Sequence, residues 1–346
     1  MTGRTLITGG AGFVGTNLAD RILGAGGRVL VFDNLSRDGA EQNLRWLTHR
    51  HGHACEVQIA DVRDRRAVAH AIARAGRVFH LAAQVAVTTS LDAPVHDAAV
   101  NLEGTINVLE GARACRSPPA LLLTSTNKVY GQLEDVELAE RDTRYEPVDP
   151  ALLVRGIDER RPLRFRTPYG CSKGAADQYV LDYAHSYGLH TIVLRMSCIY
   201  GPHQYGNEDQ GWVAHFLSRA LDDEPITVFG DGKQLRDVLY VEDLVDALLC
   251  AADDSGRLAG RAFNIGGGVE HCLSLVELID LIATEQGRAP LVEFGPWRRG
   301  DQRYYVSDTA AFTAATGWRQ RTPPRDGVRL LRRWLLAERN AAAAAA

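Results

Sequence analysis

A short apolar strand near the N-terminus runs directly into a glycine-rich turn and then into an amphipathic helix. Residues 5–8 are Thr-Leu-Ile-Thr, the turn carries Gly9, Gly12 and Gly15, and apolar residues then recur at helical spacing as far as Gly24. In such a unit the first glycine permits a tight turn, the second lets backbone approach a pyrophosphate, and the third lets helix pack on strand. The free N–H groups at the start of the helix favour an anion. The sequence therefore predicts a dinucleotide-binding α/β unit.

An acidic residue after the second predicted strand indicates which dinucleotide is bound. Residues 28–32 are Arg-Val-Leu-Val-Phe, and Asp33 follows them. A carboxylate at this position hydrogen-bonds the adenosine ribose and repels a 2′-phosphate, so NAD is favoured over NADP. Arg37, four residues further on, leaves NADP open, because an arginine nearby can accommodate that phosphate.

Tyr169 and Lys173 stand four residues apart in a predicted helix, which puts both on one face. An ammonium beside a phenol favours the phenolate, so we expect a lowered pKa for Tyr169 and a general base that works near neutral pH. The chain holds three lysines, Lys128, Lys173 and Lys233, against 36 arginines. This bias indicates that lysine is kept where a guanidinium cannot replace a compact ammonium. The same spacing arises by chance in many helices, so alone it leaves a structural role open.

Strand-like and helix-like segments alternate along the chain to about residue 196. Predicted strands are 5–8, 28–32, 56–60, 78–81, 120–124 and 191–195, and predicted helices include 13–24, 64–75, 96–115 and 168–187. This alternation predicts an α/β fold with a Rossmann-type, doubly wound parallel sheet. Functional residues are then expected at the carboxyl ends of the strands. Gly9, Asp33, Asp61, Ala82, Ala83 and Thr124 all follow or end a predicted strand.

Longer loops and isolated short strands follow residue 202, which predicts a second, smaller lobe. We expect an NAD-binding domain over residues 1–197, with 237–260 returning to it. A mixed α/β substrate lobe is expected from 198–236 and 261–340. The alanine run 341–346 is expected to be a tail.

The composition is that of an ordinary globular protein, with 45% hydrophobic and 24% charged residues. A net charge of −4 provides no basic surface for nucleic acid. No apolar run approaches the roughly 18 residues of a membrane span, and no signal peptide is expected. The six cysteines lack C-x-x-C spacing. We therefore expect reduced thiols, no metal site and a cytoplasmic protein.

Motifs spread over nearly the whole chain recur together in one known family. They are Gly9-x-x-Gly12-x-x-Gly15, Asp61-Val62, His80-Leu-Ala-Ala83, Asn101-x-x-Gly104-Thr105, Thr126-x-x-Val-Tyr-Gly131, Tyr169-x-x-x-Lys173, Tyr200-Gly-Pro202, the stretch Phe229 to Asp237, Asn264-Ile-Gly-Gly267 and Asp301-Gln-Arg303. In this combination the chain resembles the extended short-chain dehydrogenases/reductases that modify nucleotide sugars. The resemblance implies a triad of Thr126, Tyr169 and Lys173. Thr126 would hydrogen-bond the reacting sugar oxygen, Tyr169 would take and return its proton, and Lys173 would also bind the nicotinamide ribose.

The two residues after Thr126, Asn127 and Lys128, distinguish branches of this family. The resemblance implies an Asp-Glu pair here in sugar 4,6-dehydratases, and a cysteine at the second position in a 3,5-epimerising relative. An amide cannot serve as the acid and an ammonium cannot replace the carboxylate base, so dehydration is disfavoured. The chain is instead similar to the CDP-paratose 2-epimerase (CDP-tyvelose epimerase) branch in Thr-Asn-Lys-Val-Tyr-Gly, in residues 142–145, 168–179 and 209–213, and in the length of the insert between Gly131 and Pro168.

This resemblance implies NAD-dependent inversion at C2 of a CDP-linked sugar, of the CDP-paratose or CDP-glucose type, through a transient 2-keto intermediate. It also implies a homo-oligomer, either dimer or tetramer. An epimerase acting at C4 or on a UDP or GDP sugar stays open, as do a net dehydrogenase and a catalytically silent NAD-binding regulator.

The resemblance and the strand ends together give two sets of candidate residues. For the cofactor they are Gly9, Gly12, Phe13, Val14, Gly15, Asp33, Asn34, Ser36, Arg37, Asp61, Val62, Leu81, Ala82, Ala83, Gln84, Asn101, Thr124, Tyr169 and Lys173. For the substrate they are Gln84, Val87, Thr126, Asn127, Lys128, Ser197, Gln204, Tyr205, Gln210, Gly211, Trp212, Val228, Arg236 and Arg303. Arg236 and Arg303 are expected to clamp the diphosphate, because two guanidinium groups can fork-bond phosphate oxygens.

Overall fold

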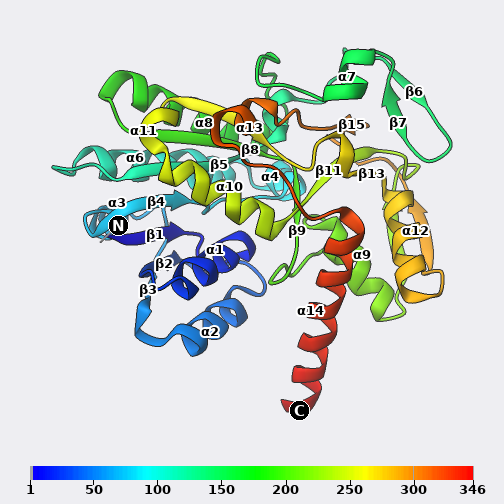
Figure 1. Ribbon diagram of the computed structural model, residues 1–346, viewed down its shortest axis with the longest axis horizontal. Helices are drawn as coiled ribbons and strands as arrows, with labels where there is room; N and C mark the ends of the chain where they lie inside the picture. The colour runs from blue at the N-terminus through cyan, green and yellow to red at the C-terminus, as the bar shows by residue number, and fades with distance from the viewer. Residues whose placement is uncertain (1–2, 299, 346) are drawn as a thin grey trace.

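A seven-stranded, all-parallel sheet forms the centre of the protein in the computed structural model, which describes residues 3–298 and 300–345 (Figure 1). Its strand order is β12-β8-β5-β4-β1-β2-β3. The strands are β1 (Arg4–Thr8), β2 (Val29–Asp33), β3 (Cys55–Ile59), β4 (Ala75–His80), β5 (Ala120–Thr126), β8 (Thr191–Met196) and β12 (Arg261–Ile265). The predicted doubly wound Rossmann-type sheet is confirmed.

Helices cover both faces of this sheet because neighbouring strand residues point to opposite sides. In β1, Ile7 packs in a core with α1, α2 and α10, whereas Leu6 packs in a second core with α3, α6 and α8. The helices are α1 (Phe13–Gly24), α2 (Ala40–His51), α3 (Arg65–Ile72), α6 (Gly104–Arg113), α8 (Thr167–Tyr187) and α10 (Val241–Asp253). Short helices α4 (Val87–Asp92) and α5 (Pro94–Ala98) precede α6, and α11 (Ser255–Leu258) follows α10.

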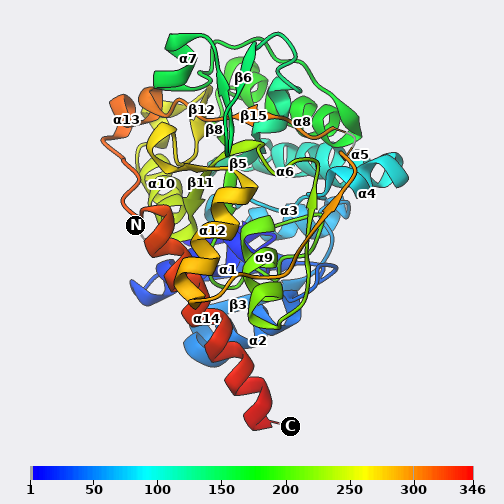
Figure 2. The same cartoon turned by 90° about the vertical axis from the view of Figure 1, so that its right-hand side faces the viewer.

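A smaller assembly of short strands and helices stands beyond the carboxyl ends of the sheet. Its strands are β9 (Cys198–Tyr200), β10 (Ile226–Phe229), β11 (Leu235–Tyr240), β13 (Cys272–Leu273), β14 (Val292–Gly295) and β15 (Tyr304–Tyr305). Its helices are α9 (Trp212–Leu221), α12 (Leu275–Gln286) and α14 (Pro324–Ala345), which share one apolar core and lie side by side in Figure 2. The insert after Gly131 forms the hairpin β6 (Leu138–Glu140)–β7 (Tyr145–Pro147) and α7 (Pro150–Arg155).

Two expected boundaries differ from the structure. Residues 261–265, expected in the substrate lobe, form β12, which pairs with β8 in the central sheet. The following α13 (Ala310–Thr316) also packs there, because Phe312 stacks edge-on against Phe263 of β12. The expected alanine tail is helical as far as Ala345, where it extends α14 away from the body (Figures 1 and 2). Alanine has the highest helix propensity of any residue, which explains this continuation. Ala346 lies outside the described residues. Among the helices of residues 3–298 and 300–345, none is long and apolar enough to cross a membrane.

Candidate active site

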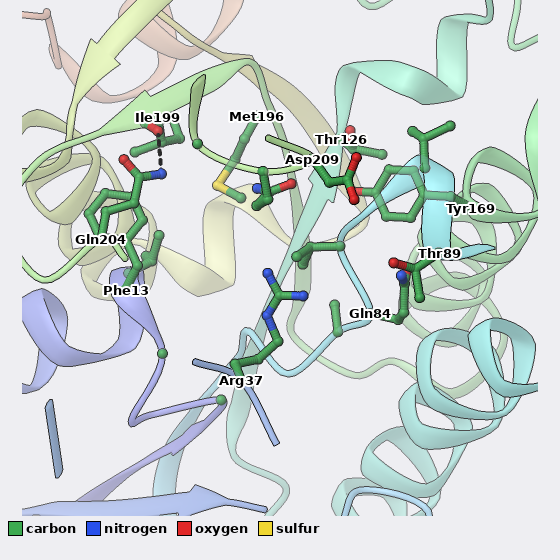
Figure 3. A pocket seen from close by; sticks show the side chains of 18 of the residues that line it. Phe13, Arg37, Gln84, Thr89, Thr126, Tyr169, Met196, Ile199, Gln204 and Asp209 are labelled. Atoms are coloured by element: carbon green, nitrogen blue, oxygen red, sulfur yellow. Dashed lines mark hydrogen bonds between the residues drawn. The ribbon is translucent and has the colours of Figure 1, made fainter. Parts of the chain in front are cut away.

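A cavity of about 680 Å³ opens at the carboxyl ends of the central strands and reaches into the smaller lobe. One wall is formed by the turns after β1, β2 and β4, and the opposite wall by residues of α9, β10 and β11. Figure 3 shows Tyr169 and Thr126 on one side of this cavity, with Phe13 and Gln204 across from them. The site therefore joins the glycine turn to the predicted triad.

The glycine turn has no room for side chains. Gly9 has a positive φ of 69°, and a Cβ on it would lie 2.7 Å from the backbone nitrogen of Ala82. A Cβ on Gly15 would lie 2.2 Å from the carbonyl oxygen of Gly9. Helix α1 starts after Gly12, with no side-chain cap on its first N–H groups. An uncapped helix start that faces a cavity through bare backbone is suited to hold a phosphate anion.

Asp33 lies at the end of β2 in the position expected for a ribose contact. Its two carboxylate oxygens accept the backbone N–H groups of Ala11 (3.0 Å) and Leu35 (2.8 Å), which fixes the carboxylate at the cavity wall. Burial raises the pKa of Asp33, and these N–H donors oppose the rise. A carboxylate oxygen has more than one acceptor site, so each can still accept a hydroxyl hydrogen bond. Arg37 lines the same end of the cavity (Figure 3).

Helix α8 and the end of β5 bring the predicted triad together. Tyr169 and Thr126 are each 8% exposed and line the cavity together. Lys173 Nζ donates a 2.7 Å hydrogen bond to the carbonyl of Thr124, which holds the ammonium against the strand end. Thr126 Oγ1 also accepts the N–H of Lys128 at 3.3 Å and so starts the 3₁₀ turn Asn127–Tyr130.

The expected effect of Lys173 on Tyr169 is not what the structure shows. Burial raises the pKa of Tyr169 to about 12, the neighbouring Thr126 hydroxyl lowers it, and the Asp97 carboxylate raises it further. Lys173 is directed to the Thr124 carbonyl, and burial lowers its own pKa to about 8 while Asp177 and Asp97 oppose this. The prediction of a lowered Tyr169 pKa from the spacing alone was wrong, because helical spacing does not report desolvation.

Comparison with known proteins identifies this arrangement. The profile of the NAD dependent epimerase/dehydratase family matches residues 5–266. The chain belongs to this family. The CDP-paratose 2-epimerase of Salmonella typhi is 43% identical over 338 residues, which are 96% of this chain and 98% of that protein. The UDP-glucose 4-epimerase of Mycolicibacterium smegmatis is 33% identical over 94% of this chain and 96% of that protein. A crystal structure of the Thermus thermophilus UDP-glucose 4-epimerase in complex with NAD superposes with a TM-score of 0.80, at 31% identity, and covers 96% of this chain and 99% of that one.

The expected family, fold, cofactor and enzyme class are confirmed by these comparisons, and the cofactor of this epimerase/dehydratase is NAD. The glycine turn, which has no side chains at Gly9, Gly12 and Gly15, and the uncapped start of α1 fit the pyrophosphate of NAD. Asp33 and Lys173 stand where the two riboses are expected to bind. Ser125 Oγ and Gln204 Oε1 line the cavity as buried polar atoms with no hydrogen-bond partner in the described residues. Unpaired buried polar atoms are costly, so their presence favours a polar ligand here.

Most of the predicted site residues line this one cavity. For the cofactor these are Gly9, Gly12, Phe13, Val14, Gly15, Asp33, Asn34, Ser36, Arg37, Asp61, Val62, Leu81, Ala82, Ala83, Gln84, Thr124, Tyr169 and Lys173. For the substrate they are Gln84, Val87, Thr126, Asn127, Lys128, Ser197, Gln204, Tyr205, Gln210, Gly211, Trp212 and Arg236. Within residues 3–298 and 300–345, no group of three or more His, Cys, Asp or Glu side chains is placed to hold a metal ion.

Three predicted residues lie outside the cavity wall. Asn101 is buried behind the cavity wall. Its side-chain oxygen accepts the backbone N–H of Gln84 and its side-chain nitrogen donates to the Gln84 carbonyl, which supports the loop after β4. Val228 is fully buried in the core of the smaller lobe, because strand alternation turns its neighbours Thr227 and Phe229 toward the cavity instead. Arg303 is exposed, and its guanidinium lies over the rings of Tyr145 and Trp297.

Arg298 brings a second guanidinium, beside that of Arg236, to the substrate end of the cavity. It lies 3.6 Å over the Phe229 ring and pairs with Glu208 and Asp209 at the cavity wall. Arg236 is buried nearby, and its guanidinium contacts Asp301 at 3.4 Å. The sequence contains Arg298 and Arg303 on either side of Asp301, and no local pattern tells which of them faces the cavity. The structure therefore places Arg298, and not Arg303, at the cavity wall with Arg236.

Proposed function

We propose that this chain is a nucleotide-sugar epimerase that uses NAD to invert C2 of a CDP-linked sugar, of the CDP-paratose or CDP-glucose type. The observation that carries the proposal is the row Thr126-Asn127-Lys128 beside Tyr169 at the cavity wall. It combines a proton-transfer pair with two residues that cannot perform the acid–base elimination of a dehydratase. The 43% identity with a CDP-paratose 2-epimerase over nearly the full length of both chains supports the same conclusion.

The chemistry required is oxidation of C2 followed by reduction from the opposite face. NAD, when bound, supplies a reversible hydride acceptor and a positive charge that favours the Tyr169 phenolate. Tyr169 accepts the proton of the C2 hydroxyl as C2 becomes a ketone, and it returns that proton after the sugar has turned. Thr126 hydrogen-bonds the same oxygen. The reaction is redox-neutral, because the hydride returns to C2 and the proton returns to the oxygen on C2.

The remaining residues hold the substrate while the ketone turns. Arg236 and Arg298 provide guanidinium groups that can bind the diphosphate, which keeps the nucleotide fixed. Asn127 and Lys128 provide neutral and charged donors for the sugar oxygens. Phe229 and Thr227 of β10 line the part of the cavity that we assign to the base.

The test is proton NMR of the purified protein with CDP-glucose and with CDP-paratose, without added NAD, in deuterated buffer. The expected result is a C2 epimer that carries no deuterium at C2, because the hydrogen returns directly from bound cofactor. Deuterium at C2 would indicate proton exchange and refute the proposed mechanism.

UDP and GDP sugars in the same assay decide between this proposal and its nearest alternative. The relatives that are named UDP-glucose 4-epimerases favour this alternative, since the same triad serves epimerisation at C4. Turnover of a UDP-sugar with none of a CDP-sugar would replace the proposed substrate. Accumulation of a free ketone would indicate a dehydrogenase, and bound NAD with no turnover of any sugar nucleotide would indicate a silent regulator.

From the family resemblance we also propose a cytoplasmic homo-oligomer, either dimer or tetramer. Light scattering of the purified protein measures the mass directly, against 37.9 kDa for one chain.

A further inference from the structure

Gln302 connects two of the cationic side chains of the cavity. Its side-chain oxygen accepts a hydrogen bond from Lys128 Nζ at 2.9 Å. Its backbone carbonyl accepts a hydrogen bond from the guanidinium of Arg236. Gln302 is fully buried in the segment that leads into β15. One residue therefore touches Lys128 through its side chain and Arg236 through its backbone.

The orientation of the Gln302 carboxamide is determined by its second partner. Its nitrogen donates to the carbonyl of Gly131. Only the nitrogen of a carboxamide can donate to a carbonyl, so the oxygen must face Lys128. Gly131 directly follows the turn Asn127–Tyr130 that carries Lys128. The carboxamide thus ties both the lysine and the end of its turn to the β15 segment.

Lys128 has hydrogen-bonding capacity that the protein does not use. An ammonium has three N–H donors, and among the described residues Gln302 accepts one of them. Lys128 lines the cavity, two residues after Thr126. Lys128 is half-buried at the cavity wall, so its other two N–H groups are available to acceptor oxygens of a bound ligand. Arg236 and Arg298 already face the diphosphate in the proposed binding mode, which leaves the sugar oxygens for Lys128.

We propose that Gln302 is a positioning residue that holds Lys128 and Arg236 at a fixed spacing, so that Lys128 binds a sugar oxygen beside the reacting carbon while Arg236 binds the diphosphate. The inference rests on the proposed function and adds a residue to it. While the keto sugar turns within the site, the protein must hold the substrate both at the sugar and at the diphosphate. An ammonium with two free donors can hold an oxygen in either orientation of the ring.

The charges around Lys128 give this arrangement a measurable signature. Arg236 of β11 faces it, as do Asp301 of the segment before β15 and Cys198 of β9. Burial, followed by Arg236, lowers the pKa of Lys128 to about 8, and Asp301 and Cys198 oppose this. A carboxylate in place of the Gln302 amide would raise that pKa by about 1 to 3 units, the usual effect of an adjacent opposite charge.

The experiment is NMR titration of the NAD-bound protein labelled with ¹³C at lysine Cε, which gives three lysine signals because the chain holds three lysines. Lys128→Met and Lys233→Arg assign them. We expect Gln302→Glu to raise the pKa of Lys128 and to leave that of Lys173 unchanged. Gln302→Met should produce no rise. Gln42→Glu, on the exposed side of α2, is the charge-matched control and should change neither lysine.

Ligand titrations with the wild-type protein test the assignment without requiring turnover. CDP-glucose should shift the Lys128 signal, and CDP alone should leave it within experimental error. In kinetics with the sugar that the enzyme turns over, Lys128→Met should lower kcat by about 100-fold, as loss of a fixed hydrogen-bond donor beside the reacting carbon does. Gln302→Met should lower kcat about tenfold, as partial loss of that donor. The Kd for CDP should stay within about threefold in both variants, since Arg236 still has the backbone carbonyl of residue 302.

Each contrary result would refute one part of the proposal: the positioning role of Gln302, the sugar contact of Lys128, or the proposed function. An unchanged Lys128 pKa in folded Gln302→Glu would show that Gln302 does not position the lysine. Should Gln302→Glu fail to fold, an unchanged kcat in Gln302→Met would show the same. An equal shift of the Lys128 signal with CDP and with CDP-glucose would assign Lys128 to the diphosphate and refute the sugar contact. If the wild type epimerises no sugar but its Lys128 signal responds only to CDP-glucose, the proposed function fails and the sugar contact stands.

Discussion

Replacing Gly15 by alanine tests whether the glycine turn holds the cofactor as the structure implies. A Cβ at residue 15 would lie 2.2 Å from the carbonyl oxygen of Gly9 and 2.6 Å from the Cα of Gly10. Both neighbours are backbone atoms, so no side-chain rotation relieves the contact. The turn and α1 must separate by roughly 1 Å to reach an ordinary van der Waals distance.

A shift of this size acts directly on the N–H groups that face the pyrophosphate. Moving a donor roughly 1 Å from the usual 2.9 Å takes it beyond hydrogen-bond distance. The loss of one hydrogen bond to a charged group costs about 1.5–3 kcal/mol. At about 1.4 kcal/mol per factor of ten, we expect the Kd for NAD to rise roughly 10- to 150-fold.

The assay is calorimetric titration of NAD into protein stripped of nucleotide, together with the NAD content of the protein as purified. Gly24→Ala is the matched control, because it makes the same change at the other end of α1, where a Cβ meets nothing within 4 Å. The control should bind NAD within about twofold of the wild type. If Gly15→Ala binds NAD as tightly as Gly24→Ala while remaining folded, close approach of the turn to the pyrophosphate is not what Gly15 provides, and the reasoning is refuted.

Three further predictions concern catalysis, binding and pH. Tyr169→Phe should keep its NAD but lose about 10²–10⁴-fold in kcat, the usual contribution of a general acid–base group; turnover within tenfold of wild type would exclude Tyr169 as that group. Arg298→Leu should weaken CDP binding by about 10- to 100-fold, as loss of a charge-assisted phosphate contact does, whereas Arg303→Leu should change it by less than about threefold; equal effects in calorimetry would contradict the placement of these two arginines. Burial lowers the pKa values of Lys128 and Lys173 from 10.5 to about 8. Between these values the unfolded chain binds more protons than the folded one at both lysines, so they make the free energy of unfolding rise with pH from about 8. Urea unfolding at pH 7.5 and at pH 9 measures this change. Between these pH values the free energy of unfolding should rise less, or fall more, in Lys128→Met than in the wild type. An identical pH dependence in the two proteins would contradict the desolvation of Lys128.

Features of the fold that depend on neighbours in the chain were accessible from the sequence. The glycine turn, Asp33 after β2, and Tyr169 with Lys173 on α8 all follow from local spacing and from the rule that parallel strands collect their carboxyl ends at one edge. That rule places residues from the ends of six separate strands in one cavity, as the structure shows. Strand β12 was not accessible in the same way, because only its pairing with β8 shows that it belongs to the central sheet and not to the smaller lobe.

Side-chain direction at the substrate end depends on contacts between distant segments. Val228 and Phe229 are both apolar, and only the packing of β10 against α9 and α12 buries the first and turns the second toward the cavity. Arg298 and Arg303 were equivalent candidates for the diphosphate until the loop before β15 placed one over Phe229 and the other over Tyr145. The pKa of Tyr169 depends likewise on burial, which no spacing reports.

The sequence by itself determined the Rossmann-type dinucleotide-binding unit and the position of Tyr169 and Lys173 on one helix face, because backbone conformation and helical spacing are local properties. The role expected for Thr126 came from the family resemblance. Only the tertiary structure decided that Gln302 orients Lys128, that Arg298 rather than Arg303 faces the cavity, and that Asn101 supports the site from behind it. These relations join side chains separated by up to 174 positions in the chain. Such contacts exist only once the two lobes have packed, since burial and hydrogen-bond partners are set by neighbours in space.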